Sequence, residues 1–144
     1  EEDKRRATIH LLLSYVEEHY AEKLSLEDLA DYTQYNRTYV STLFKQMVGI
    51  NFHEYLTRVR FQHALNDLTY TRDNLTDIAL KNGFPDLKTL TARFRSTFQR
   101  TPAQYRAALK PDEVLYDKVR QFLDPQDMVL RKKLGEYAKT GIIK

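Results

Sequence analysis

Apolar residues recur along most of the chain at the three- to four-residue spacing of an α-helix. The first such stretch, residues 5–20, places Ile9, Leu12, Leu13 and Val16 on one face. This periodicity predicts an amphipathic helix that buries one side. Comparable stretches follow at residues 25–33, 36–48, 52–69, 74–83, 86–98 and 102–109. We therefore expect an all-α fold with seven helices between residues 5 and 109 and no sheet.

Local signals mark where these helices begin and end. Residues that favour helix N-caps stand at the first position of six of the stretches or directly before it: Ser25, Asn36, Asn51, Asn74, Asp86 and Thr101. Asp28 and Glu54 follow Ser25 and Asn51 at capping-box spacing, and Pro102 stands at a first helical position. Gly49 and Gly83 are where the third and fifth helices are expected to stop.

An internal repeat relates two parts of the chain. Leu26, Leu29, Ala30 and Tyr35 are matched 49 residues later by Leu75, Ile78, Ala79 and Phe84, and after one extra turn residue the shift becomes 50. Each copy reads as a short helix, a tight turn and a longer helix, which is the geometry of a helix-turn-helix. A helical solenoid is the other interpretation, but it usually needs three or more copies. We expect helix-turn-helix units at 25–49 and 74–99, joined by a linker helix at 52–69.

The amino-acid composition and the absence of certain motifs exclude several classes of function. The chain of 144 residues has no cysteine, so disulfides, thiolate metal sites and cysteine nucleophiles are excluded. Its four histidines lack the spacing of a helical metal pair. No glycine-rich phosphate loop or nucleophile motif occurs, so we expect no catalytic residue, no metal, no cofactor and no enzyme activity.

Charge is unevenly distributed although the net charge is only +3. Basic residues outnumber acidic ones in 36–62 and again in 84–106. Such segregation can make one face of a small domain positive, although solvated helix faces would look similar. No apolar run approaches the ~18 residues of a membrane span, and no signal-peptide pattern opens the chain. We expect a cytoplasmic protein without a membrane partner.

Together these motifs resemble the DNA-binding domain of the AraC/XylS transcription regulators over residues 5–109. The stretches that carry the resemblance are LSLEDLA at 24–30, YVSTLFKQMVG at 39–49, FHEYLTRVRFQHALNDL at 52–68, LTDIALKNGF at 75–84 and LTARFRSTFQRTPAQYR at 90–106. The resemblance implies sequence-specific binding of double-stranded DNA, with recognition helices at about 37–48 and 87–98 in successive major grooves.

The resemblance also implies which residues read bases. In the first unit these are Thr38, Ser41 and Thr42, and in the second unit they are Leu87, Lys88, Thr89 and Ala92. Many family members carry arginine where this chain has Thr42 and Ala92. Short hydroxyl and methyl groups can touch a thymine methyl or make one hydrogen bond, but they cannot form the bidentate hydrogen bonds that arginine makes to guanine.

Other residues are candidates for contact with the DNA backbone. They are basic side chains or residues at helix starts: Arg37, Lys45, Asn51, Arg58, Arg95, Arg100 and Thr101. Free N–H groups and the helix dipole favour phosphate at a helix N-terminus. Arg60 and Arg106 also belong to the set of arginines that contact phosphate or form internal ion pairs, and for Arg60 we favour an ion pair.

A second function class competes with DNA binding, namely a helical protein–protein module whose repeated units serve only for packing. The basic character of both repeats favours DNA. Family members usually carry a sensing or dimerisation domain, so we expect this chain to be part of a larger regulator, with RNA polymerase as a candidate partner. Residues 111–144 read as a C-terminal helical extension in which Leu115 and Phe122 pack on the domain or on a partner.

The linker helix also predicts a spacing. About 18 residues at ~1.5 Å each give a helix of roughly 27 Å. Each recognition helix is also offset from the end of the linker helix. We therefore expect the two recognition helices to lie about one DNA turn, ~34 Å, apart.

Overall fold

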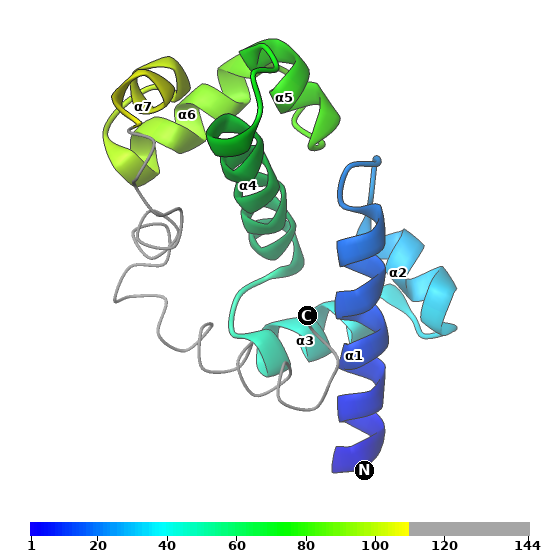
Figure 1. The fold of residues 1–144 in the computed structure, drawn as a ribbon. Helices are drawn as coiled ribbons and strands as arrows, with labels where there is room; N and C mark the ends of the chain where they lie inside the picture. Colours follow the sequence, from blue (N-terminus) through cyan, green and yellow to red (C-terminus); the bar gives the residue numbers. More distant parts are fainter. Residues whose placement is uncertain (110–144) are drawn as a thin grey trace. The chain divides into compact units, whose positions relative to one another are not determined.

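The computed structural model describes residues 1–109, and these form seven helices without a strand (Figure 1). In order they are α1 (Glu2–His19), α2 (Leu26–Thr33), α3 (Arg37–Val48), α4 (Phe52–Tyr70), α5 (Leu75–Lys81), α6 (Leu87–Phe98) and α7 (Pro102–Ala108). The all-α expectation is confirmed. The expectations for residues 111–144, including the packing of Leu115 and Phe122, lie outside the described residues.

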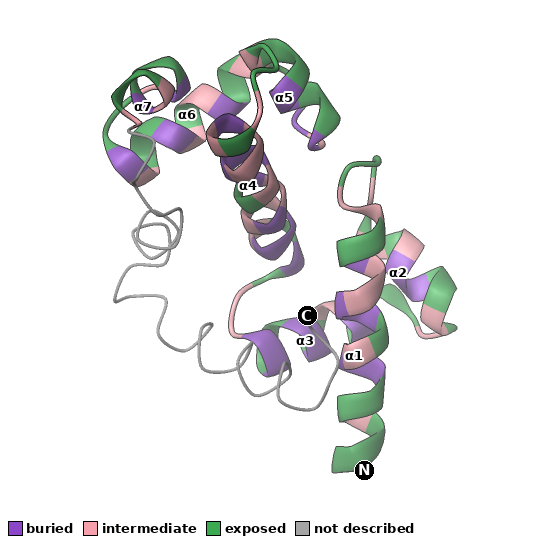
Figure 2. Ribbon diagram, viewed as in Figure 1, coloured by how far each residue is buried: buried purple, intermediate pink, exposed green. Residues whose placement is uncertain are grey.

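The described chain divides into two compact units, and the boundary between them in the sequence falls after Thr57, within α4. In the first unit α1, α2 and α3 pack against one another. Its core contains Leu12 and Val16 of α1 and Phe44 of α3, all with no exposed surface. The Phe44 ring meets Tyr55 edge-on, with 5.3 Å between ring centroids. Buried residues lie on one side of these helices, and exposed residues lie on the other side (Figure 2).

The second unit has an aromatic core. The rings of Phe61, Phe94, Phe98 and Tyr105 come from α4, α6 and α7. The centroid of the Phe94 ring lies 5.1 Å from that of Phe61 and 5.2 Å from those of Phe98 and Tyr105. Tilted and edge-on aromatic pairs of this kind add about 0.5–1.5 kcal/mol beyond the burial of their area. The periodicity of aromatic residues in 90–106 therefore reflects a shared core.

The repeat is visible in the backbone of both turns. The Tyr35 amide donates to the Ala30 carbonyl at 3.2 Å, and the Phe84 amide donates to the Ala79 carbonyl at 3.0 Å. Both alanines are buried. Helices α2 and α5 begin 49 residues apart, whereas α3 and α6 begin 50 residues apart. The extra residue therefore lies in the second turn, where the sequence placed it.

Most of the helix boundaries follow the local signals. The capping boxes at Ser25 and Thr101 are complete, with hydrogen bonds in both directions. At the start of α4 the Glu54 amide donates to the Asn51 side-chain oxygen at 2.8 Å. Helix α1 begins at Glu2, earlier than residue 5.

Helix α5 ends at Lys81 rather than at Gly83, so the predicted boundary was wrong by two residues. The Asn82 side chain is 2% exposed and donates to the Asp67 carboxylate at 2.8 Å and to the Ile78 carbonyl at 2.8 Å. Gly83 then adopts φ 93° in the turn. A tertiary contact to α4 therefore accompanies the end of α5 before the glycine is reached.

Helix α6 ends on Gln99, which adopts the left-handed conformation with φ 57°, whereas α3 ends on Gly49. Glycine takes this conformation without the steric penalty of a side chain. We expect Gln99→Gly to raise the free energy of unfolding by about 0.5–1 kcal/mol, measured by urea denaturation. The reciprocal control, Gly49→Gln, should lower it by a similar amount. A destabilising Gln99→Gly variant would contradict this account.

Candidate nucleic-acid interface

Side chains fix the starts of α3 and α6 in the same way. Asn36 precedes α3, and its side-chain oxygen accepts from the Tyr39 amide at 2.8 Å. Asp86 precedes α6, and its carboxylate accepts from the Thr89 amide at 2.7 Å. Each cap satisfies a backbone donor that would otherwise lack a partner at the helix start. The first turn of each helix is therefore well defined, which positions the side chains that follow.

The predicted reading positions of α3 lie opposite its core face. Val40, Leu43 and Phe44 are buried, whereas Thr38 and Thr42 are exposed. The flanking basic residues Arg37 and Lys45 are exposed too, and Ser41 is half-buried. The helix thus separates a packed side from a side of short polar groups between two cations.

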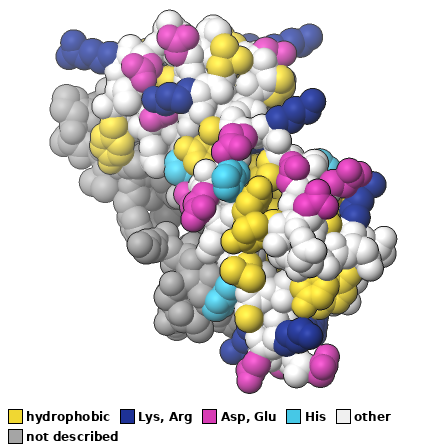
Figure 3. All heavy atoms as spheres, turned by 90° about the vertical axis from the view of Figure 1, so that its right-hand side faces the viewer, with side chains coloured by type: hydrophobic (Ala, Val, Ile, Leu, Met, Phe, Trp, Pro, Cys, Tyr) yellow, Lys and Arg dark blue, Asp and Glu magenta, His cyan; other side chains and the backbone are white. Residues whose placement is uncertain are grey.

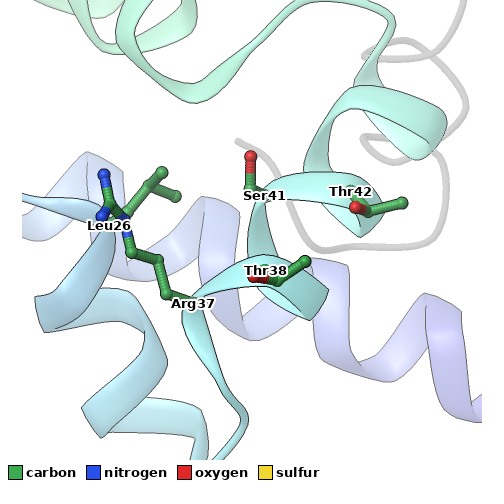
Figure 4. Close-up of a pocket in the computed structure, with 5 residues that line it drawn as sticks. All are labelled: Leu26, Arg37, Thr38, Ser41 and Thr42. Atoms are coloured by element: carbon green, nitrogen blue, oxygen red, sulfur yellow. The ribbon is translucent and has the colours of Figure 1, made fainter.

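These residues line a hollow with one residue from α2. Leu26, Arg37, Thr38, Ser41 and Thr42 surround an open space of about 270 Å³, which we call the α2–α3 hollow (Figure 4). Leu26 is the first residue of α2 and is half-buried. Sequence reasoning missed Leu26, because an apolar residue in an amphipathic helix reads as part of the core.

The predicted reading positions of α6 have more varied environments. Lys88 and Ala92 are exposed, but Leu87 is half-buried and packs against the core of the second unit. The Thr89 hydroxyl donates to the Asp86 carboxylate at 2.7 Å. Hydrogen bonds from this hydroxyl and from the Thr89 amide lower the pKa of Asp86. Thr89 thus takes part in the helix cap, and Leu87 supports the core.

Thr91 is a second residue that the sequence analysis missed. It follows Ser41 by 50 residues, the same shift that relates α3 to α6, and like Ser41 it is half-buried. The repeat itself was the signal that could have found it. Applying the shift to Thr38, Ser41 and Thr42 gives Lys88, Thr91 and Ala92.

The candidates for backbone contact differ in exposure. Arg95 and Arg100 are exposed, and Arg58 is half-buried. Asn51 is exposed and Thr101 half-buried, and both side chains accept amide hydrogen bonds that begin the next helix. These two side chains therefore serve as helix N-caps, whether or not they also contact DNA.

Arg106 has a different role from phosphate contact or an ion pair. Its guanidinium donates to the backbone carbonyls of Asp67, Leu68, Thr71 and Asp73, where α4 ends and the following loop begins. The carbonyls in the last turn of a helix have no partner within the helix. The Asp67 carbonyl also accepts from the Thr71 amide at 2.9 Å and from the Thr71 hydroxyl at 2.7 Å. Arg106 therefore supplies donors to the end of α4 from α7. For Arg60, which is half-buried, burial lowers the pKa.

Charge is mixed on the face of the molecule in Figure 3. Lysine and arginine side chains lie among aspartate and glutamate there, and hydrophobic side chains also reach the surface. No helix within residues 1–109 is long and apolar enough to cross a bilayer. In the same residues, no group of three or more His, Asp or Glu side chains is placed to hold a metal ion.

Comparisons with known proteins agree with this architecture. A family model described as a helix-turn-helix domain matches residues 29–108. An uncharacterised helix-turn-helix-type transcriptional regulator of Staphylococcus aureus (strain COL) is 38% identical over 98 residues. The match covers 68% of this chain but only 13% of that relative, so the chain spans about an eighth of its length.

Two solved structures have the same fold. One is a transcriptional regulator from Chromobacterium violaceum, described among AraC-type DNA-binding domain-containing proteins, with 29% identity and a TM-score of 0.63 over 70% of this chain and 90% of that one. The other is the DNA-binding domain of AdpA in complex with a target DNA, with 26% identity and a TM-score of 0.63 over 67% and 86% of the two chains. With two helix-turn-helix units and a family match over more than half of its length, this chain belongs to the AraC-type helix-turn-helix family.

Proposed function

We propose that this chain is the sequence-specific DNA-binding domain of a transcription regulator, and that α3 and α6 read successive major grooves. One observation carries the proposal. Two units share the same short helix, turn and longer helix, down to the hydrogen bonds of Tyr35 and Phe84. A helix-turn-helix places its second helix in the major groove, and the first turns of α3 and α6 are capped and carry exposed side chains.

The domain proposed for this function spans residues 5–109. Its first helix-turn-helix is 25–49, its linker helix 52–69 and its second helix-turn-helix 74–99. The AdpA domain, which has the same fold, was solved with its target DNA. That precedent supports double-stranded DNA as the partner of this chain.

Base reading is proposed to differ between the two helices. On α3, Thr38, Ser41 and Thr42 offer hydroxyl and methyl groups, whereas α6 offers Lys88 as a long polar side chain beside the small Ala92. Hydroxyl groups pair with several base edges, and methyl groups favour thymine. We expect much of the discrimination to come from methyl contacts and DNA shape.

The whole protein is proposed to be a larger regulator. The Staphylococcus relative is much longer than the matched region. A sensing or dimerisation domain would supply the signal, RNA polymerase is a candidate partner, and the cytoplasm is the expected compartment. Catalysis forms no part of this proposal.

Selection of bound sites from a random pool of duplex DNA tests the function directly. We expect one enriched site of about two helical turns that contains two unlike elements, and binding that weakens steeply with salt. A protein–protein module would enrich no sequence. Failure to enrich any site, together with the absence of salt-sensitive binding to duplex DNA, would overturn the proposal.

The exposed arginines of the second unit give a further prediction. Arg95→Ala and Arg100→Ala should each weaken binding to selected and random duplexes by the same factor, because phosphate contacts carry no base information. Each should also reduce the slope of log affinity against log salt by about 1. Lys4→Ala, which removes an exposed cation of α1, is the control and should leave the slope unchanged. A changed base preference at one position would contradict the phosphate assignment.

A further inference from the structure

The α2–α3 hollow has a distinctive lining for a surface that reads DNA. Leu26 provides an apolar side chain from α2, and α3 provides the hydroxyl groups of Thr38, Ser41 and Thr42. Arg37 adds a cation, and no acidic residue is among the lining residues. The hollow therefore combines an apolar contact, hydroxyl donors and positive charge within one small space.

This combination matches one base edge better than the others. In the major groove, thymine presents its C5 methyl group beside the O4 acceptor, whereas cytosine presents an amino donor and the purines present N7 with O6 or an amino group. Thymine is thus the base that offers an apolar group and an acceptor together. The cation at Arg37 suits the negatively charged backbone of the same strand.

We propose that the α2–α3 hollow receives the major-groove edge of one thymine, with its methyl group against Leu26. Leu26 is then a specificity-determining residue contributed by the first helix of the unit rather than by the recognition helix. The inference rests on the proposed function, since it requires α3 to enter a major groove.

The second unit lacks the same lining. The repeat places Leu75, Leu87 and Ala92 at the positions of Leu26, Arg37 and Thr42. Of the three hydroxyl groups in the hollow only that of Ser41 has a counterpart, in Thr91, because Lys88 and Ala92 stand at the positions of Thr38 and Thr42. The cation is lost as well, since Leu87 packs against the core of the second unit. The thymine contact is accordingly assigned to the element that the first unit reads.

Deoxyuridine provides a probe that removes only the methyl group. Each thymine of the selected site is replaced singly by deoxyuridine, and affinity is measured by fluorescence anisotropy. One replacement, in the element read by the first unit, should weaken binding about fourfold, the factor expected for one buried methyl group. The other replacements should have smaller effects.

Variants of Leu26 connect this thymine to the hollow. The Leu26→Ala variant should bind the duplex with this thymine and the duplex with deoxyuridine in its place equally well, because the methyl group has lost its apolar contact. Leu26→Met keeps an apolar side chain of similar size and should preserve the fourfold preference. Leu80→Ala, which truncates a 51% exposed leucine of α5, is the matched control and should preserve it too. Circular dichroism verifies folding, and Leu26→Gln, which keeps the aliphatic stem but ends it in a polar amide, replaces the alanine variant if that variant is unfolded.

The outcomes distinguish failure of the thymine contact from failure of the proposed DNA-binding function. If a site is selected but no single deoxyuridine weakens binding, or if the fourfold effect persists in the folded Leu26 variant, alanine or glutamine, the thymine contact is wrong and DNA recognition stands. If no site is selected at all, the proposed function itself fails.

Discussion

Replacing Arg106 by alanine is expected to lower the free energy of unfolding of the second unit by about 2–4 kcal/mol. The guanidinium donates to four backbone carbonyls at the end of α4 and in the loop that follows. A hydrogen bond from a charged group contributes about 1.5–3 kcal/mol, and a carbonyl left without a partner costs more when it is buried. Because Arg106 is half-buried, water will replace part of this network in the variant, which keeps the expected loss below the sum.

Other side chains hold the same segment. Lys81 of α5 forms ion pairs with Asp67 at 3.3 Å and Asp73 at 3.2 Å, and the Asn82 amide donates to Asp67. The end of α4 is thus held from α5 and from α7. Lysine cannot reproduce the planar donors of a guanidinium, so Arg106→Lys should recover only a minor part of the stability.

Urea denaturation followed by circular dichroism measures the effect. Arg100→Ala is the control, because it removes an exposed arginine of the same unit and should change stability by less than about 0.5 kcal/mol. An Arg106→Ala variant as stable as the parent would show that water satisfies these carbonyls as well as the guanidinium does.

The helices could be predicted from the sequence because their signals are local. Ser25 and Thr101 begin helices through hydrogen bonds to residues three positions later, and Gly49 ends α3 through its own conformation. The end of α5 could not be predicted in this way. It is accompanied by the contact of Asn82 with Asp67, which lies 15 residues away in the sequence.

In the candidate site, too, some features follow from the local sequence and others depend on contacts with neighbouring elements. Exposure of Thr38 and Thr42 follows from helical periodicity, which places them opposite Val40 and Phe44. The environments of Leu26 and Arg106 depend on neighbouring elements instead. An apolar residue that lines a surface hollow and an arginine that binds carbonyls 33–39 residues away leave no distinctive pattern in one sequence.

Inserting five base pairs between the two elements of the selected site is expected to weaken binding roughly 100-fold or more. Half a helical turn moves the second element to the opposite face of the duplex and ~17 Å further along it. One recognition helix then loses its element, and each lost base-pair contact typically costs about 1–3 kcal/mol. Losing a whole element should therefore exceed the effect of any single substitution in the DNA.

The reason lies in α4, which is one uninterrupted helix of 19 residues without glycine or proline. At ~1.5 Å per residue it extends about 28 Å, and sharp bends in helices usually occur at proline, at glycine–serine pairs or at bulges. We therefore expect α4 itself to stay one continuous helix when the domain meets the inserted site, and this leaves one element unbound. That both helices bind successive grooves stays a prediction until this measurement is made.

A footprint on the parent and inserted sites distinguishes two-headed from one-headed binding. On the parent site one domain should protect about two turns, and on the inserted site protection should shrink to one element. The matched control is a site of parental length in which the second element is scrambled, and its affinity should equal that of the inserted site. Unchanged affinity and protection after the insertion would mean that a single unit reads DNA, because a domain that engages both elements through α4 cannot ignore their separation.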